Sequence, residues 1–573
     1  MNYTTYRELR NISYKREVFT IFNRLRGNIQ EEASTFLLIQ LSYLALKYKP
    51  ISSKEDLIES VASDFNDEYT LNQLNRVIQK VPFDIIQSIS ENYDENTLKA
   101  IILFIEDNDI RSEISGTPLG VTKLVNELLE VQSDDTVLDL GSGIGSYLLE
   151  TKMETGTEKV CGVEINIQMN IISTIRAKVA QFPIQLKLGN ILSQDYRSFK
   201  ATKVFSNPPV GVREPGIDDL IKDNRALTEL IDIEKYNISA DWAFILSSYA
   251  NQKPGGKTAV LMRNQVLFRE QDHDIREKII SDGWLEAIIT LPEKLFPNTA
   301  IPFTLLIFSE NNETVRMVDA SEISTRDQMK NILTDKNIQE IVEAYKQENE
   351  ISKHLTYQDF EKQEFVLTPI RYFGFIPDAS NMTPIDDLAR SINRGATISR
   401  KELDTMSTTK ETGIKYLKIQ DIEKSSMNKD LPNLKNVDEK YHSYFLEEGN
   451  LVISKSSPYK IARVENTKDT KILATGNLYY IQIDEEKVNP IFVEMYLKSD
   501  EGQAQLERLS TGSVIETISI KNLKTILIPN LSREEQDTLV KEYLEYEEQL
   551  DLLDRQKEII SQRRKELIEK VLQ

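Results

Sequence analysis

The sequence predicts a multidomain α/β protein, and three features of the chain lead to this fold class. At 573 residues the chain is too long for one ordinary hydrophobic core, so three or four domains are expected. Residues 1–110 show apolar side chains at helical spacing, whereas residues 111–378 alternate short apolar runs with helical segments, as parallel sheets require. Residues 532–573 carry an apolar residue at every seventh position, which is typical of a long helix that packs on another helix.

The first 110 residues are expected to form a helical domain without a catalytic motif. In the segment 36–46, apolar residues such as Phe36, Ile39 and Tyr43 occupy two adjoining faces of a helix, which favours a buried helix. Further helices are expected at 55–63, 71–80 and 95–106. The plain interpretation is a packing or docking domain.

The middle of the chain is expected to form a Rossmann-like sheet with polar residues along one edge. Strands are predicted at 136–140, 159–163, 184–188, 203–205, 258–262, 286–291 and 303–308, and helices at 121–129, 240–251, 271–282 and 325–347. The glycine loop 141–145, Glu164, Asn190 and Asn207 each follow one of the first four strands. Open α/β sheets bind ligands at the carboxyl ends of their strands, so these residues are predicted to form one site.

Composition excludes several classes of protein. A single cysteine, Cys161, excludes a disulfide framework and a cysteine-rich zinc site, and with three scattered histidines no metal is expected. The longest apolar segments are too short to span a bilayer and the N-terminus lacks a secretion signal, so a cytoplasmic protein without a membrane is predicted. A net charge of −21 argues mildly against nucleic acid as a partner, although DNA contact needs only a local basic surface.

The glycine loop and two acids indicate the cofactor. Asp139 precedes Gly141-Ser142-Gly143, and Glu164 ends the next strand at the position of a ribose-binding carboxylate. A pyrophosphate beside Asp139 would be poorly placed, whereas S-adenosylmethionine offers an amine for Asp139 and ribose hydroxyls for Glu164. The alternative is a Rossmann-type core that binds no nucleotide.

The loop Asn207-Pro208-Pro209-Val210 indicates the reaction. Two prolines make the loop rigid, so the Asn207 side-chain oxygen and the Pro208 carbonyl can accept the two protons of an exocyclic amine. Such acceptors would aim the nitrogen lone pair of a flipped adenine at a methyl donor. Alone, Asn-Pro-Pro is also common in turns that have no function.

These residues resemble the modification (methylase) subunit of type I restriction–modification systems, a family of N6-adenine DNA methyltransferases. The resemblance covers 111–375 well and the helical domain weakly, and is carried by residues 116–118, 139–143, 164, 207–209, 241–244, 253–256, 266–269, 291–292 and 367–372. It implies a class I S-adenosylmethionine-dependent methyltransferase domain over 111–378 that acts on double-stranded DNA. It also implies that Thr117 and Pro118 wrap the methionine end of the cofactor and that Asn190 lies near its adenine.

The chain departs from this family at two positions. Asn190 replaces an Asp, but its side-chain oxygen can still accept a hydrogen bond. Val210 replaces an aromatic that stacks on the flipped base, which costs on the order of 1–3 kcal/mol and slows the enzyme roughly ten- to a hundredfold, or abolishes activity. Phe296 could supply a ring from the other side, or could be an ordinary core residue. The alternative function is therefore a catalytically weak or inactive recognition subunit that binds cofactor and DNA.

Residues 379–531 are expected to form an α+β target-recognition domain. They resemble one half of a type I specificity subunit, through residues 385–395, 416–422, 448–454 and 526–531. Lys455, Lys460, Arg463 and Ser513 are the candidates for DNA contacts, and a solvated basic loop is the alternative for each.

The C-terminal helix, 532–573, is predicted to mediate association. One seven-residue row is apolar, from Leu539 to Leu567, and a second row is half polar because it contains Lys557 and Arg564. Self-association or pairing with a specificity subunit is expected. Because no nuclease motif is recognisable, cleavage in restriction or phage defence is assigned to a separate restriction subunit. Methylation of RNA or of protein glutamine is a third, disfavoured, reading.

Overall fold

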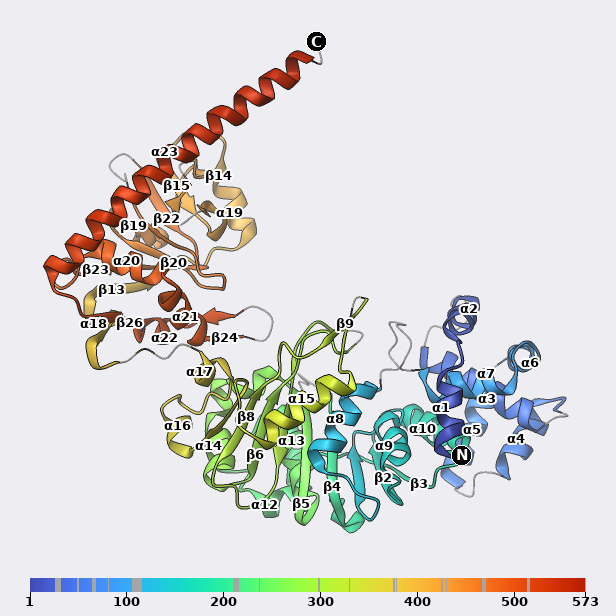
Figure 1. Ribbon diagram of the computed structural model, residues 1–573. Helices are drawn as coiled ribbons and strands as arrows, with labels where there is room; N and C mark the ends of the chain where they lie inside the picture. The colour runs from blue at the N-terminus through green and yellow to red at the C-terminus, as the bar shows by residue number, and fades with distance from the viewer. Residues whose placement is uncertain are drawn as a thin grey trace. The chain divides into compact units, whose positions relative to one another are not determined.

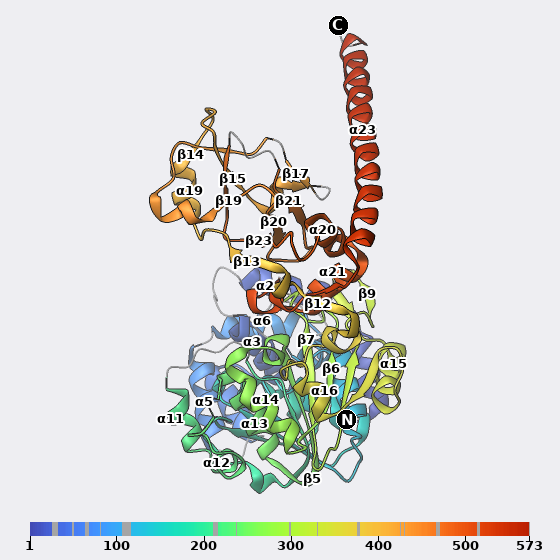
Figure 2. The same ribbon diagram turned by 90° about the vertical axis from the view of Figure 1, so that its left-hand side faces the viewer.

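The chain forms two compact units, Met1–Pro369 and Ile370–Gln573 (Figures 1 and 2). The computed structural model describes the chain except residues 26–31, 49–50, 64–67, 81, 106–115, 210–215, 237, 297–298, 329, 375–376, 378, 424–425, 429, 466–469, 513–515 and 572–573. Among the described helices, none is both long enough and apolar enough to cross a membrane. The division into four domains that the sequence predicts stays a prediction.

Where the structure describes it, the first unit begins with seven helices, in the segment for which the sequence predicts a helical domain. They are α1 (Tyr3–Arg10), α2 (Lys15–Leu25), α3 (Glu32–Lys47), α4 (Lys54–Ala62), α5 (Glu68–Lys80), α6 (Phe83–Asn92) and α7 (Glu95–Leu103). The described side chains of α3 from Leu37 to Ala45 are buried, as the apolar pattern predicts.

The helical segment shares a core with the sheet that follows it. Fully buried Arg176 on α10 (Ile167–Ala180) donates hydrogen bonds to the carbonyl oxygens of Ile102 (2.9 Å), Leu103 (2.7 Å) and Ile144 (2.8 Å). Carbonyls from α7 and from the glycine loop thus satisfy one buried guanidinium, which stabilises the join between the two segments.

The centre of the first unit is a nine-stranded sheet in the order β11-β8-β6-β7-β5-β4-β1-β2-β3. Its strands are β1 (Thr136–Leu140), β2 (Lys159–Glu164), β3 (Ile184–Leu188), β4 (Ala201–Ser206), β5 (Gln252–Arg263), β6 (Leu285–Thr290), β7 (Phe303–Phe308), β8 (Val315–Asp319) and β11 (Ser352–Leu355). Strands β1 to β5 run parallel to one another, and β7 is antiparallel to β5 and β6. The order β3-β2-β1-β4-β5 is that of a doubly wound fold, whose topological switch point lies between β1 and β4.

Helices pack on this sheet. The main ones are α8 (Leu119–Leu129), α9 (Ser146–Thr155), α13 (Ala240–Ala250), α14 (His273–Ser281) and α15 (Asp335–Lys346). Apolar residues of α8 and α15 share a core with Val137 of β1 and Phe205 of β4, so they cover one face of the sheet. Helix α13 contacts β4 and β5.

The helix predicted at 325–347 is wrong in its first part. Residues Thr325–Asp327 and Lys330–Ile332 form the antiparallel strands β9 and β10, and α15 begins only at Asp335. Thr334 sets this start, because its side chain and that of Asn337 form a capping box. Strands β8 and β11 were not predicted.

The second unit is an α+β structure that ends in a long helix. Its two larger sheets have the orders β13-β23-β20-β21 and β14-β18-β15-β22-β19. They are built mainly from β13 (Ala389–Arg394), β15 (Ile414–Leu417), β20 (Leu451–Ser454), β21 (Ile461–Arg463), β22 (Lys471–Ala474) and β23 (Leu478–Ile483). The helices α20 (Pro490–Lys498), α21 (Asp500–Arg508) and α22 (Ile520–Lys524) follow, and then α23 (Arg533–Val571).

Candidate functional site

The glycine loop after β1 is held against the end of β2. Gly141, Gly143 and Gly145 have φ angles of +88°, +52° and +78°, in the left-handed region that favours glycine. The N–H groups of Gly141 and Ser142 both donate to the Val163 carbonyl at 2.9 Å. An added Cβ at Gly143 would meet no atom within 4 Å, so the loop borders open space at this point.

Asp139 is a buried carboxylate without a full set of partners. Its residue is 3% exposed, and within the described part of the chain Oδ1 is buried without a hydrogen-bond partner. Burial, and then the nearby Glu164, raise the pKa of Asp139 well above its usual range. Ser142 Oγ is likewise buried and unpartnered among the described residues. Both oxygens can accept a hydrogen bond from a bound group.

Glu164 lies at the end of β2 with both carboxylate oxygens held by the backbone. Oε2 accepts from the Gly143 N–H at 2.8 Å, and Oε1 accepts from the Asn166 N–H at 2.7 Å. Each oxygen keeps a further lone pair for a ligand hydroxyl. Asn190 follows β3 beside it, since the Gly189 N–H donates to the Glu164 carbonyl at 3.0 Å. Asn190 Oδ1 already accepts the Leu192 N–H at 2.9 Å, which leaves it one lone pair.

The Asn-Pro-Pro loop leaves β4 next to the glycine loop. Ser206 Oγ donates to the Leu140 carbonyl at 2.5 Å, and a Cβ added to Gly141 would lie 3.9 Å from Pro208 Cα. Asn207 is half-buried, and its amide makes no hydrogen bond with any described residue. The loop therefore stands at the switch point between β1 and β4, where doubly wound sheets bind ligands. Val210 lies outside the described residues.

The residues around this edge fit S-adenosylmethionine. Asp139 pairs in register with Phe205, so it lies on the face of the sheet that α8 covers. Thr117 is buried and Pro118 is the residue that caps the start of α8. The orphaned oxygen of Asp139 needs a donor, preferably a cationic one, and the amino group of that cofactor is such a donor. The site's donors and acceptors therefore match the predicted ligand.

Two apolar residues near this edge, Ile165 and Phe296, differ in how far they are exposed. Ile165, which follows Glu164, is 63% exposed although it is large and apolar. Ile165 is not among the residues that the sequence analysis names. The only sequence feature that points to it is its position directly after Glu164, the acid that ends β2. Phe296 is partly buried on the main core and its ring lies 4.7 Å from that of Phe303, so its stacking role stays a prediction.

The predicted DNA contacts of the second unit fall into two groups. Lys460 Nζ donates to the carbonyls of Ile419 (3.1 Å) and Ile422 (2.7 Å), and Arg463 pairs with Glu494 and Glu465 at 3.2 and 2.7 Å. Internal partners thus hold these two cations.

Lys455 is placed differently, and Ser513 lies outside the described residues. Lys455 lines a pocket of about 260 Å³ together with Arg394, Thr511, Thr517 and Ser519. Burial, and then Arg394, lower the pKa of Lys455. The sequence did not identify Arg394, because Arg394 comes close to Lys455 only through the pairing of β13 with β23.

Comparisons with known proteins find similarity to DNA methylases. Residues 115–379 match the family model described as N-6 DNA Methylase. The chain is 31% identical over 296 residues to the type I restriction enzyme MjaVIII methylase subunit of Methanocaldococcus jannaschii, covering 46% of this chain and 50% of that protein. It is 24% identical over 351 residues to the type I restriction enzyme MpnII methylase subunit of Mycoplasma pneumoniae, covering 56% and 60%. The chain thus spans about half to three fifths of these relatives.

Solved structures that align with this chain include two restriction–modification proteins. The methyltransferase subunit of a type I system from Streptococcus thermophilus aligns with a TM-score of 0.49 at 18% identity, covering 62% of this chain and 98% of that one. The type IIG restriction endonuclease BpuSI aligns with a TM-score of 0.46 at 12% identity, covering 93% and 75%. The residues that match the N-6 DNA Methylase model, 115–379, include the sheet edge from Thr117 to Phe296.

Proposed function

We propose that the chain is an S-adenosylmethionine-dependent N6-adenine DNA methyltransferase with its own sequence-recognition domain, acting in restriction–modification or related phage defence. One observation carries the proposal. Within residues 115–379, which match the N-6 DNA Methylase model, the Asn207 amide and the buried carboxylate of Asp139 lie at the ends of adjacent parallel strands at the switch point. Among the described residues, neither this amide nor Asp139 Oδ1 has a hydrogen-bond partner. An amine acceptor and a cofactor anchor thus meet at one edge.

In this proposal the chain positions the reacting amine. S-adenosylmethionine, when bound, supplies the methyl group. The Asn207 side-chain oxygen and the Pro208 carbonyl each accept one N–H of the adenine amine, whose lone pair is otherwise delocalised into the ring. The amine is thereby drawn towards tetrahedral geometry. As the new N–C bond forms, the bond between the methyl group and its donor would break, and the amine would release one proton to solvent. Such fixed acceptors are worth most in a rigid loop, because they do not reorganise during the reaction.

The remaining residues of the edge hold the cofactor in this proposal. Asp139 takes the amino group, Glu164 the ribose hydroxyls, and Asn190 the adenine amine, while Gly141, Ser142 and Gly143 leave room for the ligand. Thr117 and Pro118 close over its methionine end. We add Ile165, whose exposed side chain can pack on a flat ring that Glu164 brings beside it.

DNA recognition is assigned to the second unit. Lys455 and Arg394 offer two neighbouring positive charges beside three hydroxyl groups, which suits a phosphate of the DNA backbone. Lys460 and Arg463 serve the fold instead, since Lys460 donates to two backbone carbonyls and Arg463 pairs with Glu494 and Glu465. Partner chains are a specificity subunit or a second copy at α23, and a separate restriction subunit for cleavage.

Val210 motivates the second candidate function, a recognition subunit that binds cofactor and DNA without turnover. The two functions differ in the response to Val210→Phe. A large gain of methylation would mark a weakened site, and unchanged robust activity would make Val210 a tolerated variant.

The proposal is tested with the purified full chain, radiolabelled S-adenosylmethionine and a library of duplex DNA. We expect label in N6-methyladenine within one defined sequence, and none with Asn207→Ala although that variant still binds the cofactor. Absence of N6-methyladenine from wild-type reactions, in protein shown to bind the cofactor, would contradict the enzymatic part. Unlabelled RNA as competitor separates DNA from RNA as substrate.

A further inference from the structure

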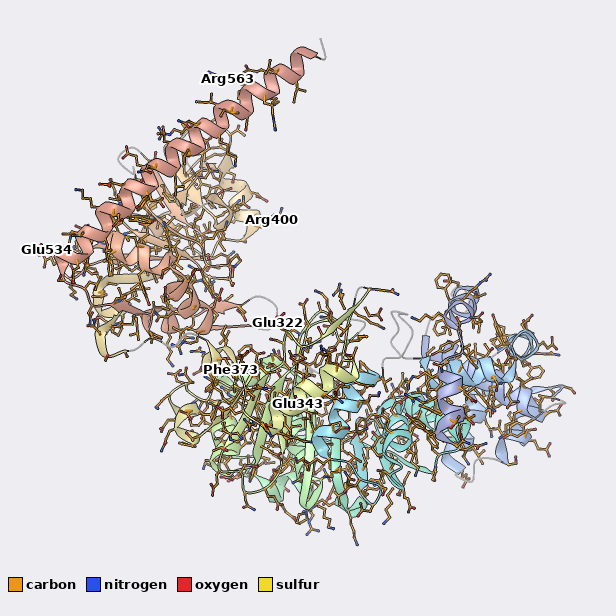
Figure 3. All side chains as sticks on the ribbon, viewed as in Figure 1. Glu322, Glu343, Phe373, Arg400, Glu534 and Arg563 are labelled. Atoms are coloured by element: carbon orange, nitrogen blue, oxygen red, sulfur yellow. The ribbon has the colours of Figure 1, made fainter. Side chains whose placement is uncertain are left out.

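Arg263, the last residue of β5, places a cation at the edge of the sheet where the parallel strands end. Its side chain is half-buried, and within the described part of the chain Nε is buried without a hydrogen-bond partner. The labelled Glu322, which follows β8, marks this edge in Figure 3, because β4, β5, β6 and β8 run in one direction. A partly desolvated guanidinium is unfavourable unless a bound group supplies the missing acceptor.

The two arginines that follow Arg263 along the chain differ from it in having partners within the fold. Arg269 contacts the Asp241 carboxylate at 3.3 Å. Fully buried Arg276 donates to the carbonyl oxygens of Phe365 at 2.6 Å and of Arg269 at 2.7 Å. These two guanidinium groups stabilise the domain, whereas that of Arg263 is available to a ligand.

The pairing of β4 with β5 places Arg263 near the Asn-Pro-Pro loop. Phe205 of β4 pairs with Ala259 of β5, so Arg263 lies on the neighbouring strand about 13 Å beyond that pair. Because residues four apart on a strand share a face, Arg263 lies on the face that Phe205 occupies. Asn207 is only two residues beyond Phe205. The cation is therefore farther out along the strands than the start of the loop.

The pairing of β5 with β7 sets aromatic rings on the other side of this cation. Arg263 is directly opposite Phe303, and side chains at opposite positions of an antiparallel pair are neighbours on one face. The Phe303 ring lies 4.7 Å from that of Phe296. The cation thus stands between the strand that leads to Asn207 and a pair of aromatic rings.

We propose that Arg263 binds a phosphate that flanks the target adenine, so that it holds the extruded nucleotide by its backbone while Asn207 holds its base. This inference rests on the proposed function and adds a second contact to the same nucleotide. Base and phosphate lie at opposite ends of a nucleotide, which matches an amine acceptor in the loop and a cation farther out. The planar guanidinium can donate two parallel hydrogen bonds to phosphate oxygens. Such a contact carries no sequence information, but it fixes the position of the strand and favours the extruded state.

The other anionic group that could reach this edge is the carboxylate of S-adenosylmethionine. The residues assigned to the cofactor, Asp139, Glu164 and Asn190, belong to the ends of β1, β2 and β3. Strand β4 separates β5 from β1 and its two neighbours on that side. A phosphate of the DNA is therefore the ligand that we assign to Arg263.

Arg263→Gln tests the contact in the full-length protein, with a duplex that carries the motif methylated by the wild-type chain. We expect kcat/KM for DNA to fall roughly 10- to 100-fold, because a hydrogen-bonded charge is lost, while the Kd for S-adenosylmethionine stays unchanged. Arg263→Lys is expected to recover part of the loss, since it keeps the charge without the fork. Lys200→Gln is the matched control, because it removes an exposed positive charge just before β4, at the opposite edge of the sheet, and should leave kcat/KM unchanged.

Uncharged phosphates identify the partner of Arg263. A methylphosphonate is placed at the phosphate on one side or the other of the target adenine. At one of these positions it should lower kcat/KM of the wild-type chain and have no further effect on Arg263→Gln, as expected for two groups in contact. Additive losses at both positions, or equal kcat/KM for Arg263→Gln and wild type, would overturn the proposal. A raised Kd for the cofactor, or an altered preference for one neighbouring base, would also overturn it, because each marks a different ligand.

Melting curves separate this role from a structural one. Arg263→Gln should leave the Tm within about 1 °C of wild type, whereas Arg276→Gln should lower it by several degrees, because two backbone carbonyls lose their donor. Equal losses of Tm in the two variants would assign Arg263 to the fold and overturn the proposal. A wild-type chain that methylates no duplex would refute the proposed function and this inference with it. Methylation by Arg263→Gln at the wild-type rate would refute the inference alone.

Discussion

Asp139 connects stability and cofactor binding, so its replacement by asparagine tests both. This carboxylate is buried, one of its oxygens has no hydrogen-bond partner among the described residues, and its pKa is raised well above the usual range by burial and by Glu164. The fold therefore tolerates a group that would be more stable in water. Asp139→Asn removes the charge and keeps the shape of the side chain.

The expected sign follows from the raised pKa. The unfolded chain loses the proton of Asp139 near pH 3.9, whereas the folded protein retains it to higher pH. The contribution of this group to stability is therefore complete below that pH and is lost as pH rises through the folded pKa. An uncompensated buried group costs about 1–3 kcal/mol, so we expect Asp139→Asn to raise the Tm of the ligand-free protein by about 2–5 °C at pH 8. The difference shrinks towards pH 4.

The same substitution should weaken cofactor binding. A hydrogen bond to a charged group contributes about 1.5–3 kcal/mol, so loss of the carboxylate raises the Kd for S-adenosylmethionine roughly 10- to 100-fold. Thermal unfolding from pH 4 to 8 and titration calorimetry measure the two effects. Asp134→Asn, an exposed change just before the same strand, is the control. A variant less stable than wild type at pH 8, or one with unchanged Kd, would refute the role given to Asp139.

Four further substitutions separate the remaining roles. Glu164→Gln should raise the Kd for the cofactor at least about tenfold, measured by calorimetry, because the ribose loses a charged acceptor; an unchanged Kd would count against that contact. Ile165→Ser should leave the Tm within about 1 °C of wild type, since the side chain is exposed, yet weaken cofactor binding several-fold; equal affinity would exclude it from the site. Lys455→Ala should weaken DNA binding and reduce its salt dependence by about one phosphate contact, with Tm unchanged, whereas Lys460→Ala should lower the Tm. If Lys460→Ala weakened DNA binding in salt titrations and Lys455→Ala lowered the Tm instead, Lys460 would be the DNA contact and Lys455 the stabilising residue.

The central sheet was predictable because its strands are short apolar runs that stop at glycine or polar residues. The sequence placed β1 and β3 at their observed bounds, and β2 and β4 within one or two residues. Strands β8 and β11 were not predicted, because Arg316 and His354 interrupt their apolar pattern. They are strands because they pair with each other in the sheet. The helix predicted over 325–332 does not form, because the capping box at Thr334 starts α15 only after this segment.

The site was predictable to the extent that it lies on strand ends. Asp139, Glu164 and Asn207 end adjacent strands, so the fold alone brings them to one edge. The remaining features depend on tertiary contacts that the sequence does not show. Sequence could not tell that the donors of Lys460 are used by backbone carbonyls, or that Arg394 comes beside Lys455. It also could not tell that the apolar rows of α23 remain exposed within one chain.

The most direct measurement of the proposed function maps N6-methyladenine across the genome of a host that lacks adenine methylation of its own. The host expresses either the wild-type chain or Asn207→Ala, whose folding and cofactor binding are verified after purification. The account predicts one methylated sequence motif with the wild-type chain and none with the variant. The same motif with both chains, or no methylated motif with a wild-type chain that binds cofactor and DNA, would contradict it.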